Sequence, residues 1–266
     1  MTRIEDHFAR TRPAKSLVGF ITAGDPTLDH TVPAMHALVA GGTDLIELGI
    51  PFSDPEAEGP AIQASSERAL ANQVTLNTVL DFVAEFRKEN STTPIILMGY
   101  LNSVLAHPDF AGAAQTAGVD GLIMVNLPPE EGNDLATRLR EHNMDLIYLL
   151  APTTTDKRAE LILQKASGFV YYVSLKGITG ASHLDAGDVA ARMAQLKAGT
   201  DLPICVGFGI KDRNTAAQIA PHADGVVVGS ALVNLLAEHE DDVQAACQAI
   251  TSAAYELRQG VDAPSD

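Results

Sequence analysis

A carboxylate stands inside an otherwise apolar segment of this chain. The run reads Glu47-Leu-Gly-Ile-Pro-Phe-Ser-Asp-Pro55, and the loop that follows carries Glu56 and Glu58 before Pro60. A buried carboxyl group costs free energy unless it is paired or performs chemistry, and burial raises its pKa so that it can transfer a proton near neutral pH. Glu47 is therefore a candidate acid–base residue. The alternative is a structural ion pair with a Lys or Arg elsewhere.

Glycine-rich segments offer a second kind of chemistry, the binding of an anion. Gly207-Phe-Gly-Ile210 and Gly229-Ser-Ala231 each follow an apolar run late in the chain. Glycine lets backbone N–H groups approach a ligand closely, and a helix that starts at Ser230 adds the positive end of its dipole. The two segments together predict a phosphate site. Turns that need glycine only for their conformation are the alternative.

A third segment, 175–187, is long and rich in glycine, and it contains Lys176, His183 and Asp185. We predict that it is a lid over the substrate, since loops of this length inside a compact domain are often functional. A solvated connection is the alternative. No His or Cys lies at ligand spacing from His183, so no metal site is predicted.

The composition excludes several classes of partner. The net charge of −16, from 18 basic and 34 acidic side chains, argues against nucleic acid or an anionic membrane. No apolar run reaches about 18 residues and no apolar signal-peptide region precedes the first strand, so a cytoplasmic location is expected. Cys205 and Cys247 are expected to be reduced structural thiols.

Eight apolar segments alternate with amphipathic ones and position these residues. Strands are expected at 17–22, 44–49, 94–100, 121–126, 146–150, 169–174, 203–207 and 225–229. Most are almost continuously apolar, which is typical of parallel strands buried on both faces. Three-to-four spacing predicts helices at 31–40, 75–88, 110–117, 130–141, 156–165, 188–197, 212–219 and 243–258.

This alternation predicts a (β/α)8 TIM barrel, rather than a doubly wound open sheet. We expect one domain over residues 1–258, with an additional N-terminal helix, extra helices after the second and eighth strands, and a disordered tail over 259–266. Along the second strand, Leu45 and Glu47 share one face and Ile46 and Leu48 the other. Glu47 should point into the barrel mouth, because barrel active sites lie at the carboxyl ends of the strands.

Several motifs make the chain resemble the tryptophan synthase alpha chain family from end to end. Besides the run from Glu47 to Pro55, they are Phe20-Ile-Thr-Ala-Gly-Asp-Pro26, Gly59-Pro60-x-Ile62-Gln63, Leu97-Met-Gly-Tyr-x-Asn102, Tyr171-Tyr-Val-Ser174, Gly177-Ile-Thr-Gly180, Gly207-Phe-Gly-Ile210 and Gly229-Ser230. The resemblance implies a TIM-barrel lyase that cleaves indole-3-glycerol phosphate to indole and glyceraldehyde 3-phosphate by a reversible retro-aldol reaction. It implies no cofactor in this chain. It also implies a tryptophan synthase beta chain as partner, which carries pyridoxal phosphate and receives indole through a channel in an α2β2 assembly.

The resemblance also implies roles for individual residues. Glu47 matches the proton-transferring glutamate, and Glu58 stands where the family has a second catalytic acid, which holds the indole nitrogen. The matches to the phosphate-binding backbone are Gly180, Gly209, Gly229 and Ser230, and Thr179 falls in the lid. The matches to the indole pocket are Phe20, Tyr100, Ile123, Tyr171 and Phe208.

Three positions depart from the family pattern. Glu58 replaces an Asp and so carries its carboxylate one methylene further out, Glu56 replaces an apolar residue, and Asn126 replaces an Asp after the fourth strand. A working alpha subunit is the leading hypothesis. A weakened subunit that acts mainly as an allosteric binding partner of the beta chain is the second. An isomerase on a similar phosphate-binding barrel is the third, and it leaves the 47–55 segment unexplained.

Overall fold

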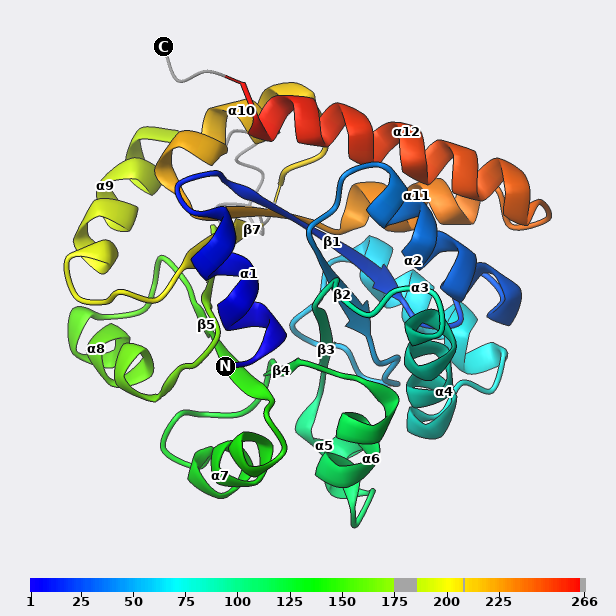
Figure 1. Cartoon of the computed structure of the whole chain (residues 1–266), viewed down its shortest axis with the longest axis horizontal. Helices are drawn as coiled ribbons and strands as arrows, with labels where there is room; N and C mark the ends of the chain where they lie inside the picture. Colours follow the sequence, from blue (N-terminus) through cyan, green and yellow to red (C-terminus); the bar gives the residue numbers. More distant parts are fainter. Residues whose placement is uncertain (175–185, 208, 264–266) are drawn as a thin grey trace.

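The computed structural model describes residues 1–174, 186–207 and 209–263. Within them, eight strands close into a barrel, each strand runs parallel to its neighbours, and the strand order follows the sequence (Figure 1). The strands are β1 (Ser16–Thr22), β2 (Leu45–Gly49), β3 (Ile95–Gly99), β4 (Gly121–Met124), β5 (Asp145–Leu150), β6 (Val170–Val173), β7 (Ile204–Gly207) and β8 (Gly225–Val228). The predicted (β/α)8 barrel is confirmed, and the open sheet is wrong.

Most of the helices surround the barrel in a ring (Figure 1). The described α-helices are α1 (Arg3–Thr11), α2 (Thr31–Ala40), α3 (Pro60–Ala71), α4 (Leu76–Arg87), α5 (Leu101–Leu105), α6 (Phe110–Ala117), α7 (Asn133–Glu141), α8 (Asp156–Lys165), α9 (Ala186–Lys197), α10 (Arg213–Ile219), α11 (Ser230–Glu238) and α12 (Val243–Val261). Two short 3-10 helices, η1 (Leu28–His30) and η2 (Ala220–His222), complete the described elements. The expected helices at the N-terminus and after the second and eighth strands are α1, α3 and the pair α11–α12. The five-residue α5 was not predicted, because one turn and a half is too short to show helical periodicity.

The C-terminal helix is longer than the sequence suggested. It extends to Val261, and both Gly260 and Val261 are buried. A Cβ at Gly260 would lie 2.3 Å from the Arg213 carbonyl oxygen, so this turn packs directly on the start of α10. The prediction of a disordered tail from residue 259 is therefore wrong for residues 259–261, where close packing on α10 outweighs the polar composition. Residues 264–266 lie outside the described part of the chain.

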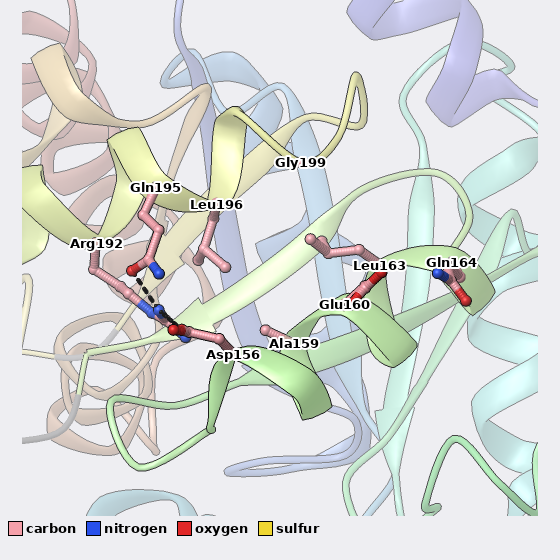
Figure 2. A pocket seen from close by; sticks show the side chains of 9 residues that line it. All are labelled: Asp156, Ala159, Glu160, Leu163, Gln164, Arg192, Gln195, Leu196 and Gly199. Atoms are coloured by element: carbon pink, nitrogen blue, oxygen red, sulfur yellow. Dashed lines mark hydrogen bonds and ion pairs between the residues drawn. The ribbon is translucent and has the colours of Figure 1, made fainter.

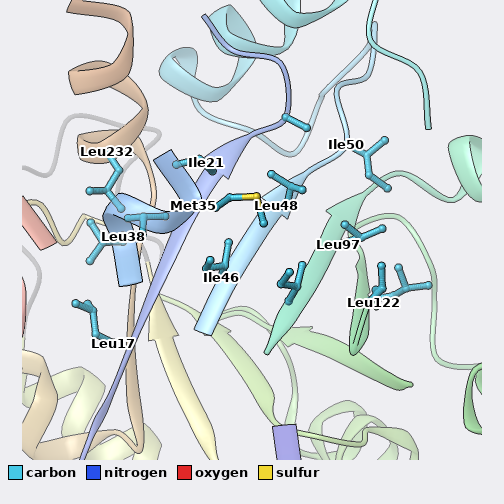
Figure 3. Packing of buried hydrophobic residues seen from close by; sticks show 14 of the residues in the cluster. Leu17, Ile21, Met35, Leu38, Ile46, Leu48, Ile50, Leu97, Leu122 and Leu232 are labelled. Carbon is cyan, nitrogen blue, oxygen red and sulfur yellow. The ribbon is translucent and has the colours of Figure 1, made fainter. Parts of the chain in front are cut away.

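Two apolar clusters fill the molecule, one outside the barrel and one within it. The outer cluster joins the strands to the helices. Figure 3 shows part of it, in which side chains of α2 and α11 lie over outward-facing side chains of the first strands: Met35, Leu38, Leu232, Leu17, Ile21, Ile46, Leu48 and Leu97. The inner cluster contains Leu45, so the predicted faces of β2 are confirmed.

Helix α1 closes the amino-terminal end of the barrel, across which it lies in Figure 1. Its apolar residues Ile4 and Phe8 belong to the inner cluster. At its start, the Thr2 hydroxyl donates to Asp145 at 2.6 Å and Arg3 pairs with Asp120 at 2.7 Å. Because this end is plugged, the carboxyl ends of the strands are left as the open face for a ligand.

Helix α3 is tied to the end of β1 by buried polar contacts. The Thr22 and Ser65 hydroxyl groups lie 2.6 Å apart, and Asn72 donates to the carbonyl oxygens of Gly24 and Pro26. Arg68 makes two hydrogen bonds to the buried carboxylate of Asp25, at 2.6 and 3.1 Å. These contacts hold α3 in place, and α3 directly follows the loop that carries Glu56 and Glu58.

We expect Arg68→Met to lower the free energy of unfolding by about 3 kcal/mol, because it leaves the Asp25 carboxylate buried without its counter-charge. Urea denaturation at neutral pH measures the change, and the exposed Arg138→Met is the control. The double variant Arg68→Met/Asp25→Asn should recover part of the loss. An unchanged urea midpoint for Arg68→Met would contradict the argument.

Candidate active site

Glu47 lies inside the barrel near the carboxyl end of β2 and is 1% exposed. Its Oε1 atom has no hydrogen-bond partner among the described residues. Burial, and to a lesser extent the nearby Glu58 carboxylate, raises the pKa of Glu47 to about 8. No lysine or arginine of the described part of the chain forms an ion pair with Glu47, which contradicts the structural ion-pair alternative there.

Glu58 comes from the loop between β2 and α3 and faces the same space. Burial raises the pKa of Glu58 to about 7. Its backbone N–H donates to the Pro55 carbonyl oxygen at 3.0 Å, and its own carbonyl oxygen accepts from the Gln63 side chain at 2.8 Å. The structure thus brings the two predicted catalytic acids close enough to interact electrostatically. Two carboxyl groups with pKa values near neutrality are typical of acid–base sites.

A small cavity of about 10 Å³, room for about one water molecule, lies beside Glu58. It lies among the ends of β1–β3, the β2–α3 loop and α3. Its lining residues are Phe20, Thr22, Gly49, Ile50, Phe52, Pro55, Glu58, Ile62, Ser66, Met98, Gly99 and Tyr100. The predicted pocket residues Phe20 and Tyr100 therefore share one cavity with Glu58. The walls are mostly apolar, with one carboxylate, and the cavity must widen to admit an aromatic ring.

The other described residues of the predicted indole pocket do not line this cavity. Ile123 is fully buried in the inner cluster, and Tyr171 packs against that cluster from β6. Burial, with the Glu47 and Glu58 charges, raises the pKa of Tyr171 well above its usual value. Ile123 and Tyr171 thus belong to the interior of the barrel.

Glycines at the ends of the last strands lie where an anion site was predicted. Gly209 has a φ of 78°, a conformation that favours glycine, and Gly229 directly precedes α11. A Cβ at Gly229 would lie 3.5 Å from Phe20, so this turn borders the indole side of the site. The N–H groups of Ser230 and Ala231 precede the hydrogen bonds of α11, whose start is marked by the Leu232 N–H donating to the Gly229 carbonyl oxygen at 2.9 Å. Gly209, Gly229 and Ser230 are thus positioned to present backbone donors.

Part of the predicted site lies outside the described residues. Thr179 and Gly180, with the rest of the predicted lid between 175 and 185, are there, and so is Phe208.

Sequence reasoning named three of the twelve residues that line this cavity and missed the other nine, among them Phe52, Ile62, Ser66 and Met98. Ile62 and Ser66 are spaced four residues apart on α3, so helical periodicity was a usable signal that one face of this helix turns inward. Phe52 stacks on Tyr100 with ring centroids 4.8 Å apart. Nothing in the local sequence indicated that contact.

A second hollow lies outside the barrel, between α8 and α9 (Figure 2). Arg192 crosses it and donates to Asp156 and Gln195, at 2.6 Å each, and to the Thr154 carbonyl oxygen at 3.0 Å. None of the predicted site residues lines this groove. Its polar groups tie two neighbouring helices together, which is a structural role.

Among residues 1–174, 186–207 and 209–263, no group of three His, Cys, Asp or Glu side chains is arranged to hold a metal ion. Nor is any helix in those ranges both long and apolar enough to cross a membrane. Cys205 is buried in the inner cluster, and neither it nor Cys247 forms a disulfide.

Comparison with known proteins gives a consistent result over the whole chain. The family model for the tryptophan synthase alpha chain matches residues 8–262. The chain is 53% identical to the tryptophan synthase alpha chain of Thioalkalivibrio sulfidiphilus, with 98% of this chain and 100% of that one covered. It is 51% identical to that of Cupriavidus taiwanensis, with coverage of 99% and 100%. The crystal structure of tryptophan synthase subunit alpha from Legionella pneumophila str. Paris superposes with a TM-score of 0.92 at 44% identity, covering 98% and 99%.

The chain belongs to the tryptophan synthase alpha chain family. Membership assigns it a lyase role in tryptophan synthesis as an alpha subunit, and it implies a beta chain as partner. The isomerase hypothesis is thereby excluded. The weakened-subunit hypothesis gains no support over a working alpha chain.

The structure shows the surroundings of Glu56 and Asn126, two of the positions that depart from the alpha chain pattern. Glu56 and Asn126 are exposed at the mouth. Asn126 accepts a hydrogen bond from the Leu101 backbone N–H at 2.8 Å, so it holds the start of α5. The side-chain oxygen of Asn126 therefore has a hydrogen-bond partner, although this residue lacks the charge of the Asp that the family has here.

The raised pKa of Glu47 leads to a prediction about stability. Folded protein keeps the Glu47 proton up to about pH 8, whereas the unfolded chain loses it near pH 4.5. Between these values the folded state binds more protons, so stability is full below about pH 4.5 and is lost as the pH rises toward 8. Glu47→Gln removes this dependence. We expect its Tm to match wild type at pH 5 and to exceed it by on the order of 5 °C at pH 8. Scanning calorimetry of both proteins across this range measures the difference, and a constant offset would contradict the assigned pKa.

Proposed function

We propose that this chain cleaves indole-3-glycerol phosphate to indole and glyceraldehyde 3-phosphate, with Glu47 as the proton-transferring residue. The observation that carries this proposal is the buried Glu47 carboxyl group, with no partner on Oε1 and a pKa of about 8, beside the Glu58 carboxyl group. A carboxyl group that is still protonated at neutral pH is a suitable general acid for carbon.

The reaction needs two proton transfers and one hydrogen bond that stabilises developing charge, and the two carboxyl groups supply them. Protonated Glu47 delivers its proton to indole C3, and Glu58 as carboxylate accepts a hydrogen bond from the indole N–H, where positive charge develops. Glu47, now a carboxylate, takes the proton of the side-chain hydroxyl group on the carbon attached to C3. The C3–carbon bond then breaks, its electron pair returns to the ring, and a carbonyl group forms on the departing fragment. Glu47 ends protonated, ready for another turnover.

The remaining residues bind and orient the substrate. Phe20 and Tyr100 line the cavity beside Glu58 and offer aromatic faces to an indole ring, for which the cavity must widen. The phosphate group fits the N–H groups of Gly209, Gly229 and the α11 start at Ser230, since backbone donors and a helix dipole bind a phosphate without lysine. Gly180 and Phe208 complete these two sets, and Thr179 belongs to the lid.

The proposed setting is a cytoplasmic α2β2 assembly with the beta chain. We propose that this chain needs no cofactor of its own and that pyridoxal phosphate resides in the beta chain, which consumes the indole. Solved tryptophan synthases from M. tuberculosis, one described as an aminoacrylate-bound form, include a chain 34% identical to this one with a TM-score of 0.87.

The decisive experiment is a single-turnover assay of indole release from indole-3-glycerol phosphate, with the chain alone and with a beta chain added. We expect indole and glyceraldehyde 3-phosphate in equal amounts, and a faster reaction when the beta chain is present. Absence of indole under both conditions would refute the proposed activity.

A further inference from the structure

The loop that carries Glu58 is held at both of its ends by one tyrosine. Tyr100 follows β3 and is 3% exposed. Its ring stacks on Phe52 near the start of the loop, with an angle of 18° between the ring planes. Its hydroxyl oxygen accepts a hydrogen bond of 2.9 Å from the Ala57 backbone N–H, one residue before Glu58. Tyr100 therefore spans the loop from its first residues to its last.

The side chain of Gln63 makes a second hydrogen bond to the backbone at Glu58. The Gln63 side-chain amide donates to the Glu58 carbonyl oxygen at 2.8 Å, and the Gln63 backbone N–H donates to the Gly59 carbonyl oxygen at 3.0 Å. Gln63 belongs to α3, and the ion pair between Arg68 and Asp25 holds this helix in place. Unlike Tyr100, Gln63 does not line the cavity.

The hydrogen bonds from Tyr100 and Gln63 matter because Glu58 has a longer side chain than the aspartate usual at this position. A glutamate has one more rotatable bond than an aspartate, so its carboxylate samples more positions for a given backbone. Tyr100 holds the Glu56–Ala57 peptide group and Gln63 holds the Glu58–Gly59 peptide group, and these hydrogen bonds restrict the backbone part of that freedom. The side-chain torsions then decide the carboxylate position within a fixed frame. A displacement of about 1 Å at a reacting group can cost on the order of a hundredfold in rate.

We propose that the Tyr100 hydroxyl and the Gln63 amide are positioning groups for the reaction, which act by fixing the backbone on either side of Glu58. This inference rests on the proposed function, since it assigns the two groups to the presentation of Glu58 to the indole nitrogen. Tyr100 thus has a role beyond that of a pocket wall. Gln63 has a role although it does not line the cavity.

The test combines two mild substitutions with removal of the Glu58 charge. Tyr100→Phe keeps the stacking ring and deletes the hydroxyl, and Gln63→Met keeps the length of the side chain and deletes the donor. We expect each to lower the single-turnover rate of indole release roughly tenfold, with KM for indole-3-glycerol phosphate within about twofold of wild type. In a Glu58→Gln background, the same substitutions should change the rate less than twofold, because no carboxylate is left to position.

Matched controls separate positioning from general loss of structure. Tyr148→Phe removes a hydroxyl from another buried tyrosine, and Gln164→Met changes a glutamine on the outer groove shown in Figure 2. Both should keep the wild-type rate. The rising limb of the kcat/KM profile, assigned to Glu58, should also move toward lower pH in Tyr100→Phe and Gln63→Met, because a loosened Glu58 is better hydrated. A merely structural role would leave this limb in place.

The outcomes are distinguishable. Equal rate losses for Tyr100→Phe and Gln63→Met with and without Glu58 would overturn the positioning role and leave the function of Glu58 standing. Full activity of both single variants would do the same. If Glu58→Gln alone retained the wild-type rate, the proposed role of Glu58 would fail, and the positioning inference with it. Should one variant not fold, the other still decides the question, since the two tethers come from different elements.

Discussion

Replacing Glu47 with Gln should lower the single-turnover rate of indole release by about a thousandfold or more. General acid–base catalysis by one group contributes about 10²–10⁴ in rate, and Glu47 is assigned two successive transfers. Glutamine is nearly isosteric and cannot donate a proton to carbon. The substrate should still bind, because the assigned phosphate and ring contacts do not involve Glu47.

Rapid-quench measurement of indole, with a binding titration on the same preparation, tests this expectation. Glu160→Gln, an exposed carboxyl group on the outer groove, is the matched control and should behave as wild type. Retention of more than about a tenth of the rate by Glu47→Gln would remove Glu47 from the proton-transfer steps. The expected gain in Tm at pH 8 shows in the same samples that the loss of activity is not a loss of fold.

Replacing Glu58 with Gln should lower the rate roughly a hundredfold, because the amide no longer neutralises the charge that develops on the indole nitrogen. The wild-type kcat/KM profile should rise as Glu58 ionises, near its pKa of about 7, and fall as Glu47 ionises, near about 8. Since the two groups interact, these limbs belong to the pair. In Glu58→Gln the rising limb should disappear while the falling limb moves to lower pH, because the neighbouring negative charge is gone.

The Glu58→Asp variant decides between a working and a weakened alpha subunit. The backbone around Glu58 is fixed by Tyr100 and Gln63, so a shorter carboxylate is displaced by about one methylene from the indole nitrogen. We therefore expect Glu58→Asp to be roughly tenfold slower than wild type. A faster Glu58→Asp variant would instead show that the natural residue is misplaced, and it would favour the weakened, mainly regulatory subunit.

Most of the fold could be read from the sequence because strand and helix periods are local properties. All eight strands lie within two residues of their expected bounds, and the inward direction of Glu47 followed from alternation along β2. Features that are very short, or that depend on tertiary contacts, could not be predicted from the sequence. Helix α5 is too short to show a period, and the last turn of α12 exists because Gly260 packs on α10.

The candidate site likewise contains residues that the sequence predicted and residues that it did not. Residue type and place at strand ends pointed to Glu47 and the late glycines, since both are visible in one dimension, whereas Glu58 was named through the resemblance to the family. It left open whether Glu47 is paired, because a partner could come from anywhere in the chain. It also missed the walls contributed by Phe52, Ile62, Ser66 and Met98, which reach the cavity from three separate elements.

The sequence by itself thus determined the barrel, the inward-facing Glu47 and the family to which the chain belongs. Only the tertiary structure decided that Glu47 is buried with an unpartnered Oε1, that Glu58 lies close enough to raise its pKa, and that Tyr100 and Gln63 hold the loop between the two acids. The physical reason is that hydration, charge–charge coupling and hydrogen bonding depend on distances between groups far apart in the chain. Residue types and spacing set which groups are available, and closure of the barrel sets what surrounds them.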